Sequence, residues 1–157
     1  MDVGSIPSTP IKINKLKLYI DMSEYKLTGM VLPFNEKSSI TNNVYTRECI
    51  QTAFDNYADQ LKDNDITVDL SHKITSLNLK DEGIYADIEL LDTEEGNNFK
   101  QLIDNGEKLA PAIKIKGFVE ESVNHYKLVD VKEIVSIDLI PQEDCPFENV
   151  DLRLIKE

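Results

Sequence analysis

Apolar and polar residues alternate with a period of two along much of this chain, and this alternation constrains its fold more than any other feature. The pattern is clear at residues 15–20, where Leu16, Leu18 and Ile20 are separated by lysine and tyrosine. Further apolar or alternating runs lie at residues 27–32, 66–70, 83–91, 109–119, 125–131, 133–140 and, more weakly, 150–155. Such half-buried strands must share one core, so we expect a fold that is mainly β.

Two segments change to the spacing of an amphipathic helix. Over residues 46–62 apolar side chains recur every three or four positions, and Thr46 can cap the first turn. A shorter helix is expected at residues 94–105, with Asp92 as its cap and Gly106 as its left-handed stop. The sequence therefore predicts an α+β fold, in which two helices flank a small, closed or nearly closed antiparallel β-barrel.

The length and charge of the chain limit its organisation and partners. Its 157 residues suit one domain over residues 15–157, preceded by a flexible, proline-containing lead-in at residues 1–14. The formal net charge of -12 argues against coating nucleic acid or an anionic membrane, because both need a basic surface. The sequence shows neither a membrane-spanning run nor a signal-peptide pattern, so we expect a cytoplasmic protein.

Few residues suit a metal or a cofactor. Cys49 and Cys145 are the only cysteines and lie far apart, which predicts neither a disulfide framework nor a zinc site. The sequence contains no glycine-rich phosphate-binding motif. We therefore expect no metal and no cofactor.

His72 is the residue that could carry chemistry on its own. It follows a predicted strand on a polar Ser71-His72-Lys73 step, where a side chain can project from a rigid scaffold and act as a general base. The alternative is an ordinary exposed loop histidine. His125 lies in a charged segment and is interpreted as a surface residue.

The order of segments is more informative than any one motif. The first segment is a glycine-containing strand followed by a serine-rich loop, at residues 27–38, and a helix follows at residues 45–54. The next is a strand that ends in Val68-Asp69-Leu70-Ser71-His72. Three later segments, bounded by glycine or proline, lie at residues 81–90, 92–106 and 133–141. This order resembles the prohead (head maturation) proteases of tailed bacteriophages, a family that shares its fold with herpesvirus assemblin. The resemblance covers residues 26–146. It implies a serine protease that cleaves phage scaffold, capsid and other head proteins, acting in the host cytoplasm and the prohead or virion, with self-association as an option.

The resemblance also implies a catalytic triad. In that family a serine attacks the peptide bond, a histidine accepts its proton, and a third polar residue orients the histidine. Carried over by position, His72 is the base and Glu133 the orienter, with Asp138 as the alternative. These residues should converge on one exposed face with the position of the serine.

The serine itself is missing from the matching strand. Residues 107–118 contain no serine, threonine or cysteine, and the expected position falls on Ala110 or, two residues along the same strand face, on Ala112. Both alanines should point away from the core, because the apolar residues of this strand alternate with them. Ser122 and Ser136 are weaker candidates for the nucleophile.

Three interpretations follow from a triad without its nucleophile. The chain can be a protease in which serine has been replaced by alanine, and which is inactive as written. It can be a natural pseudoenzyme that serves as a non-enzymatic structural or assembly component of the phage head. An unrelated small β-barrel binding module is the interpretation that discards the resemblance.

Overall fold

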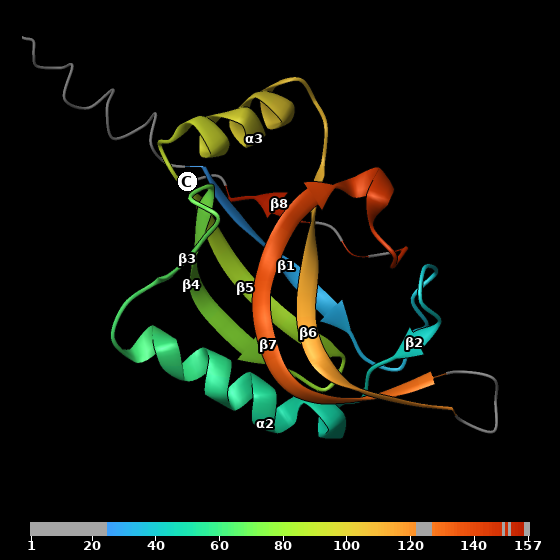
Figure 1. Cartoon of the computed structure of the whole chain (residues 1–157). Helices are drawn as coiled ribbons and strands as arrows, with labels where there is room; N and C mark the ends of the chain where they lie inside the picture. Colours follow the sequence, from blue (N-terminus) through green and yellow to red (C-terminus); the bar gives the residue numbers. More distant parts are fainter. Residues whose placement is uncertain (1–24, 122–126, 149, 151, 156–157) are drawn as a thin grey trace, which may run out of the picture.

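The computed structural model describes residues 25–121, 127–148, 150 and 152–155 (Figure 1). The predicted lead-in, the predicted strand at residues 15–20, Ser122 and His125 lie outside the described residues. The elements in chain order are β1 (Lys26–Pro33), β2 (Asn43–Val44), α2 (Arg47–Ala58), the 3-10 helix η2 (Asp59–Lys62), β3 (Ile66–Val68), β4 (His72–Leu79), β5 (Gly83–Leu90), α3 (Glu94–Asp104), β6 (Leu109–Glu121), β7 (Lys127–Pro141), the 3-10 helix η3 (Gln142–Asp144) and β8 (Arg153–Leu154).

The strands form two sheets that pack on each other. One sheet has the order β3-β4-β5-β1-β8, and the other has the order β2-β7-β6. In Figure 1, β6 and β7 cross in front of the larger sheet, with α2 at one end and α3 at the other. The core between these layers includes the fully buried side chains of Leu32, Ile50, Ile74, Ile88 and Ile137, contributed by both sheets and α2.

The prediction of a closed or nearly closed antiparallel barrel is wrong. Within the described residues no strand pairing joins the two sheets, and β2 pairs with β7 in parallel. The C-terminal segment lies between β1 of the larger sheet and β6 of the smaller sheet, and it hydrogen-bonds to both strands. The Leu152 amide donates to the Leu109 carbonyl of β6 at 3.1 Å, and the Ile155 amide donates to the Lys26 carbonyl of β1 at 2.8 Å. The alternation of apolar and polar residues in the sequence shows which face of a strand is buried. Whether the sheet closes into a barrel depends instead on contacts between segments that are distant in the sequence.

Strand β7 is strongly bent, because it carries two extra residues relative to β6. The pairing skips Val135 and Lys132, so each forms a bulge on β7. The strands predicted at residues 125–131 and 133–140 are therefore one strand with a bulge at their junction. Gly117 of β6 faces this distortion, and a Cβ there would lie 2.3 Å from the Asp130 carbonyl oxygen.

Both predicted helices are confirmed, with one correction at a cap. Thr46 caps α2 as expected, since its Oγ1 accepts from the Cys49 amide at 3.1 Å. The cap of α3 is Thr93 rather than Asp92, and Thr93 Oγ1 accepts from the Gly96 amide at 3.0 Å. A threonine hydroxyl can also donate, which a carboxylate cannot, and Thr93 uses this to bind a backbone carbonyl of the turn before β4.

Candidate functional site

A tight turn between β3 and β4 sets the position of His72. Asp69 and Leu70 both adopt positive φ, at 49° and 60°, and the Ser71 amide donates to the Val68 carbonyl at 3.0 Å. Two successive left-handed residues form the type of turn that joins twisted antiparallel strands. The chain therefore enters β4 at His72 with its side chain directed toward the second sheet.

Helix α3 holds this turn in place. Thr93 Oγ1 donates to the Leu70 carbonyl at 2.6 Å, and the Leu91 amide donates to the Ser71 carbonyl at 3.0 Å. Gly96 permits the close approach, because a Cβ at that position would lie 2.0 Å from the Leu91 carbonyl oxygen. The start of α3 thus fixes the backbone next to His72.

Both ring nitrogens of His72 are hydrogen-bonded. Nε2 lies 2.9 Å from the Ile137 carbonyl oxygen of β7, and Nδ1 lies 2.6 Å from Ser71 Oγ. A carbonyl oxygen can only accept, so Nε2 carries the proton and, in the neutral ring, Nδ1 accepts from the Ser71 hydroxyl. Within the described residues no strand pairs with this part of β7 on the side away from β6. His72 therefore binds a carbonyl at an open sheet edge and links the two sheets.

The environment of His72 favours its neutral form. The residue is 1% exposed, and burial lowers the pKa of its imidazole below the usual 6.5. The Ile137 carbonyl and the negative charges of Asp138 and Asp69 act in the opposite direction without cancelling this effect. The expectation of an exposed histidine past the end of a strand is wrong, because His72 is the first residue of strand β4 and its side chain is buried. Its role as a base stays a prediction.

The two alanines occupy different environments on β6. Ala110 is fully buried and pairs with Ile140, so this position does not lie on the expected exposed face. Ala112 is half-buried and pairs with Asp138, the residue after the carbonyl that His72 binds. Ala112 also lines a pocket of about 160 Å³ together with Val31, Ile40, Tyr45 and Phe147. Ala112 is therefore the better position for a group that must meet a ligand.

Glu133 and His72 contact different residues. Its carboxylate is 3.8 Å from Lys116 Nζ on the neighbouring strand, and its side chain is 60% exposed. The hydrogen bonds of His72 go to Ser71 and Ile137 instead. Of the two proposed orienters, Asp138 has the stronger electrostatic effect on His72.

A polar cluster that the sequence did not reveal surrounds Asp138. Ser136 Oγ donates to Asp138 Oδ1 at 2.9 Å, and Lys114 Nζ lies 3.1 Å from Asp138 Oδ2. The hydrogen bond and charge of Asp138 raise the pKa of Lys114, so this lysine is a cation and not a base. Ser136, one of the two weaker candidates for the nucleophile, is thus bound to a carboxylate. The one signal in the sequence for this cluster is the period of two along β6, which places Lys114 on the same strand face as Ala112.

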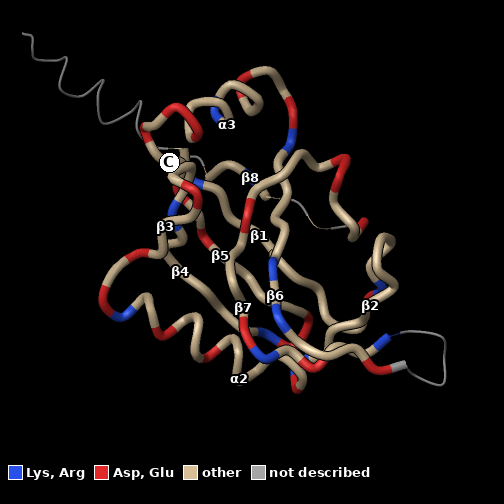
Figure 2. The backbone as a smooth tube through the Cα atoms, in the orientation of Figure 1, with Lys and Arg blue, Asp and Glu red and all other residues tan. Residues whose placement is uncertain are grey.

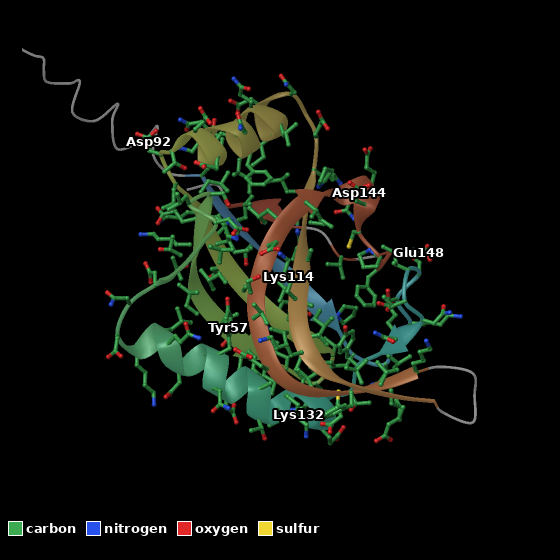
Figure 3. The ribbon with its side chains drawn as sticks, viewed as in Figure 1. Tyr57, Asp92, Lys114, Lys132, Asp144 and Glu148 are labelled. Carbon is green, nitrogen blue, oxygen red and sulfur yellow. The ribbon has the colours of Figure 1, made fainter. Side chains whose placement is uncertain are left out.

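Tyr57 of α2 also approaches this region (Figure 3). Its ring is buried, and its hydroxyl lies near the Ile137 backbone without making a hydrogen bond of acceptable geometry. Burial raises the pKa of Tyr57 to about 12, so the hydroxyl keeps its proton at neutral pH. In the sequence, Tyr57 is only one of the apolar positions of the helix predicted at residues 46–62.

Other kinds of site find no support in the described part of the chain. No group of three or more histidine, cysteine, aspartate or glutamate side chains is arranged to hold a metal ion there. None of the helices in those residues has the length and apolar character needed to span a bilayer.

The fold is similar to that of a known protein. A solved structure of the bacteriophage T4 capsid assembly protease, gp21, superposes with a TM-score of 0.63. The match covers 73% of this chain and 79% of that chain, with 13% sequence identity. No family model matches the chain, and no curated protein matches its sequence. An identity this low shows the fold alone, so the chain has a fold like that of a phage capsid assembly protease.

Proposed function

We propose that this protein acts in phage capsid assembly, where it binds head proteins through a prohead-protease fold without hydrolysing them. The likeness in fold to a capsid assembly protease supports this over an unrelated binding module. Its partners would be scaffold and capsid proteins, met in the host cytoplasm and the prohead. The fold kinship with herpesvirus assemblin remains part of the same proposal.

The state of His72 is the observation that carries the proposal. A base must accept a proton from a nucleophile that substrate can reach. In His72, Nε2 carries a proton bound to the Ile137 carbonyl, and Nδ1 accepts from the hydroxyl of Ser71, which is itself only 3% exposed. The facing strand β6 (Leu109–Glu121) contains no serine, threonine or cysteine. Loss of a triad nucleophile typically lowers the rate by several orders of magnitude.

A protease that has lost only its serine is the second candidate. The pocket beside Ala112 favours it, because a hydroxyl at this position would border open space. Ala110 offers no such space, since it is fully buried. The two candidates therefore differ in what a serine at position 112 should do.

The test is to mix the purified protein with the scaffold and capsid proteins of the phage that encodes it. Binding is followed by co-sedimentation, and cleavage by mass spectrometry of all components. We expect binding without cleavage for the unaltered chain and for the A110S and A112S variants. Cleavage by A112S that also requires His72 would show that the chain is a protease lacking only its serine. Cleavage by the unaltered chain, or absence of binding, would overturn the proposal.

A further inference from the structure

Strand β6 is a long strand at the edge of its sheet. In the order β2-β7-β6, one side of β6 pairs with β7 and the other side has no strand partner within the described residues. The end of β6 and the start of β7 extend beyond the body of the molecule (Figure 1). We call residues 114–120 the β6 arm. An unpaired edge is a template for adding another strand, and the arm contains no proline to prevent this.

The β6 arm also exposes large apolar side chains. Phe118 is 64% exposed and Val119 is 50% exposed, both far above the core residues of the same sheet. Lys132 lies over the Phe118 ring at 5.7 Å from its centroid and leaves much of the ring accessible. Apolar side chains beside an unpaired edge are typical of a surface that is covered by a partner.

The order of charges along the arm identifies the partner. Lys114 and Lys116 precede the apolar centre and Glu120 follows it, so the arm is basic at one end and acidic at the other (Figure 2). We propose that the β6 arm pairs antiparallel with the β6 arm of a second copy of this chain, about a two-fold axis at Gly117. This register sets compatible residues opposite each other: Lys114 with Glu120, Ile115 with Val119, and Lys116 with Phe118.

The antiparallel arrangement is the one that the charges select. Residues opposite each other in a pair of strands project from the same face, and opposite charges there are favourable while like charges are unfavourable. Parallel pairing in register would place lysine against lysine and glutamate against glutamate. By symmetry the antiparallel arrangement makes the Lys114–Glu120 pair twice, and it adds cation–π contact between Lys116 and Phe118.

Two terms oppose the pairing and predict a weak dimer. Lys114 and Lys116 already contact Asp138 and Glu133 of their own chain, and each copy carries a net charge of -12. A single pair of strand edges also buries less than the ~1,200 Å² of a standard stable interface. We therefore expect a weak dimer, with dissociation on the order of 100 µM.

Charge reversal tests the pairing by sedimentation velocity over a range of concentrations. K114E places like charges together twice, as does E120K, so each variant should dimerise about tenfold more weakly than the unaltered chain. An equimolar mixture of the two variants should recover the lost affinity, because each reversed residue then meets an opposite charge. The double variant K114E/E120K should recover it in a single protein.

Matched controls separate this effect from net charge and from folding. K62E and E143K make the same changes in charge at exposed positions outside the β6 arm and should dimerise like the unaltered chain. Circular dichroism of K114E checks that loss of the Lys114–Asp138 pair leaves the fold intact. A chain that stays monomeric at several hundred micromolar, reversal variants that match their controls, or a mixture without recovery would each overturn the proposal.

Discussion

Leu70 shows how much the position of His72 depends on one strained residue. Leucine rarely adopts positive φ because its Cβ then approaches the following carbonyl oxygen, yet Leu70 has φ of 60°. Its side chain is 62% exposed, so packing does not hold it there. The hydrogen bond from Thr93 to the Leu70 carbonyl and the turn bond from Ser71 to Val68 maintain this conformation instead.

Replacing Leu70 by glycine should stabilise the fold. L70G removes the left-handed strain, and we expect the free energy of unfolding to rise by about 0.5–1 kcal/mol in urea denaturation. L70A is the matched control, because it removes the exposed side chain but keeps a Cβ at positive φ. L70A should stay within about 0.5 kcal/mol of the unaltered chain. Destabilisation by L70G would show that the leucine side chain makes a contribution that its exposure does not suggest.

At the scale of elements, the bend of β7 depends on a close contact with β6. The bulges at Lys132 and Val135 bend β7 along its length. This bend brings the Ile137 carbonyl to His72. Gly117 allows the backbones to approach at the first bulge, where any Cβ would meet the Asp130 carbonyl. The curvature that completes the site thus requires a glycine some twenty residues away in sequence from Ile137.

The G117A variant tests this requirement. The added methyl group must displace backbone atoms, so we expect a loss of about 1–3 kcal/mol in the free energy of unfolding. K116A, at the exposed neighbouring residue, should change stability by less than about 0.5 kcal/mol. In the unfolding experiment, equal effects of the two variants would mean that the bulge relaxes without cost.

Local elements could be predicted from the sequence, because their signals lie within a few residues. The helix at Thr46 and the stop at Gly106 were found from caps and apolar spacing. Strand β4 was missed, since Thr75, Ser76 and Asn78 interrupt its apolar pattern and Thr75 forms a bulge against β5. The missed strand is also why His72 was expected at an exposed position.

The candidate site was predicted only in part, for a related reason. Its members His72 and Asp138 could be selected by residue type and order, but their partners are set by contacts between distant strands. No local pattern shows that the Ile137 carbonyl is left open at a sheet edge, or that Glu133 meets Lys116. The same limit applies to the arrangement of the two sheets, because the C-terminal segment that hydrogen-bonds to both β6 and β1 is distant in sequence from them.

At the scale of the whole molecule, His72 connects the two sheets and should make their packing sensitive to pH. Its pKa in the folded chain lies below the unfolded value of 6.5, so the folded chain binds fewer protons than the unfolded chain between these two pKa values. The free energy of unfolding should then fall as the pH decreases from about 6.5 toward the lowered pKa, by up to about 1.4 kcal/mol per pH unit.

The groups around His72 determine how this effect can be isolated. The negative charges of Asp138 on β7 and Asp69 in the turn act on the ring, Lys114 pairs with Asp138, and Tyr57 of α2 stays protonated throughout this range. Acidification also relieves repulsion in a chain with net charge -12, which acts in the opposite direction. A comparison of two proteins that share these groups therefore reports on the imidazole alone.

The comparison uses H72Q, whose amide can hydrogen-bond but does not titrate. Urea unfolding between pH 7.5 and 5.0 should show the unaltered chain losing its advantage over H72Q as the pH falls, since protonation of the buried imidazole costs desolvation that the amide never incurs. H125Q, which removes the second histidine, should keep the pH dependence of the unaltered chain.

H125Q also leaves a single imidazole, whose titration can be followed by NMR if H72Q proves too unstable to compare. An advantage that does not change with pH, or a titration midpoint at or above 6.5, would mean that the ring is not held neutral between the sheets. His72 could then accept a proton, which would contradict the proposal that it does not act as a catalytic base.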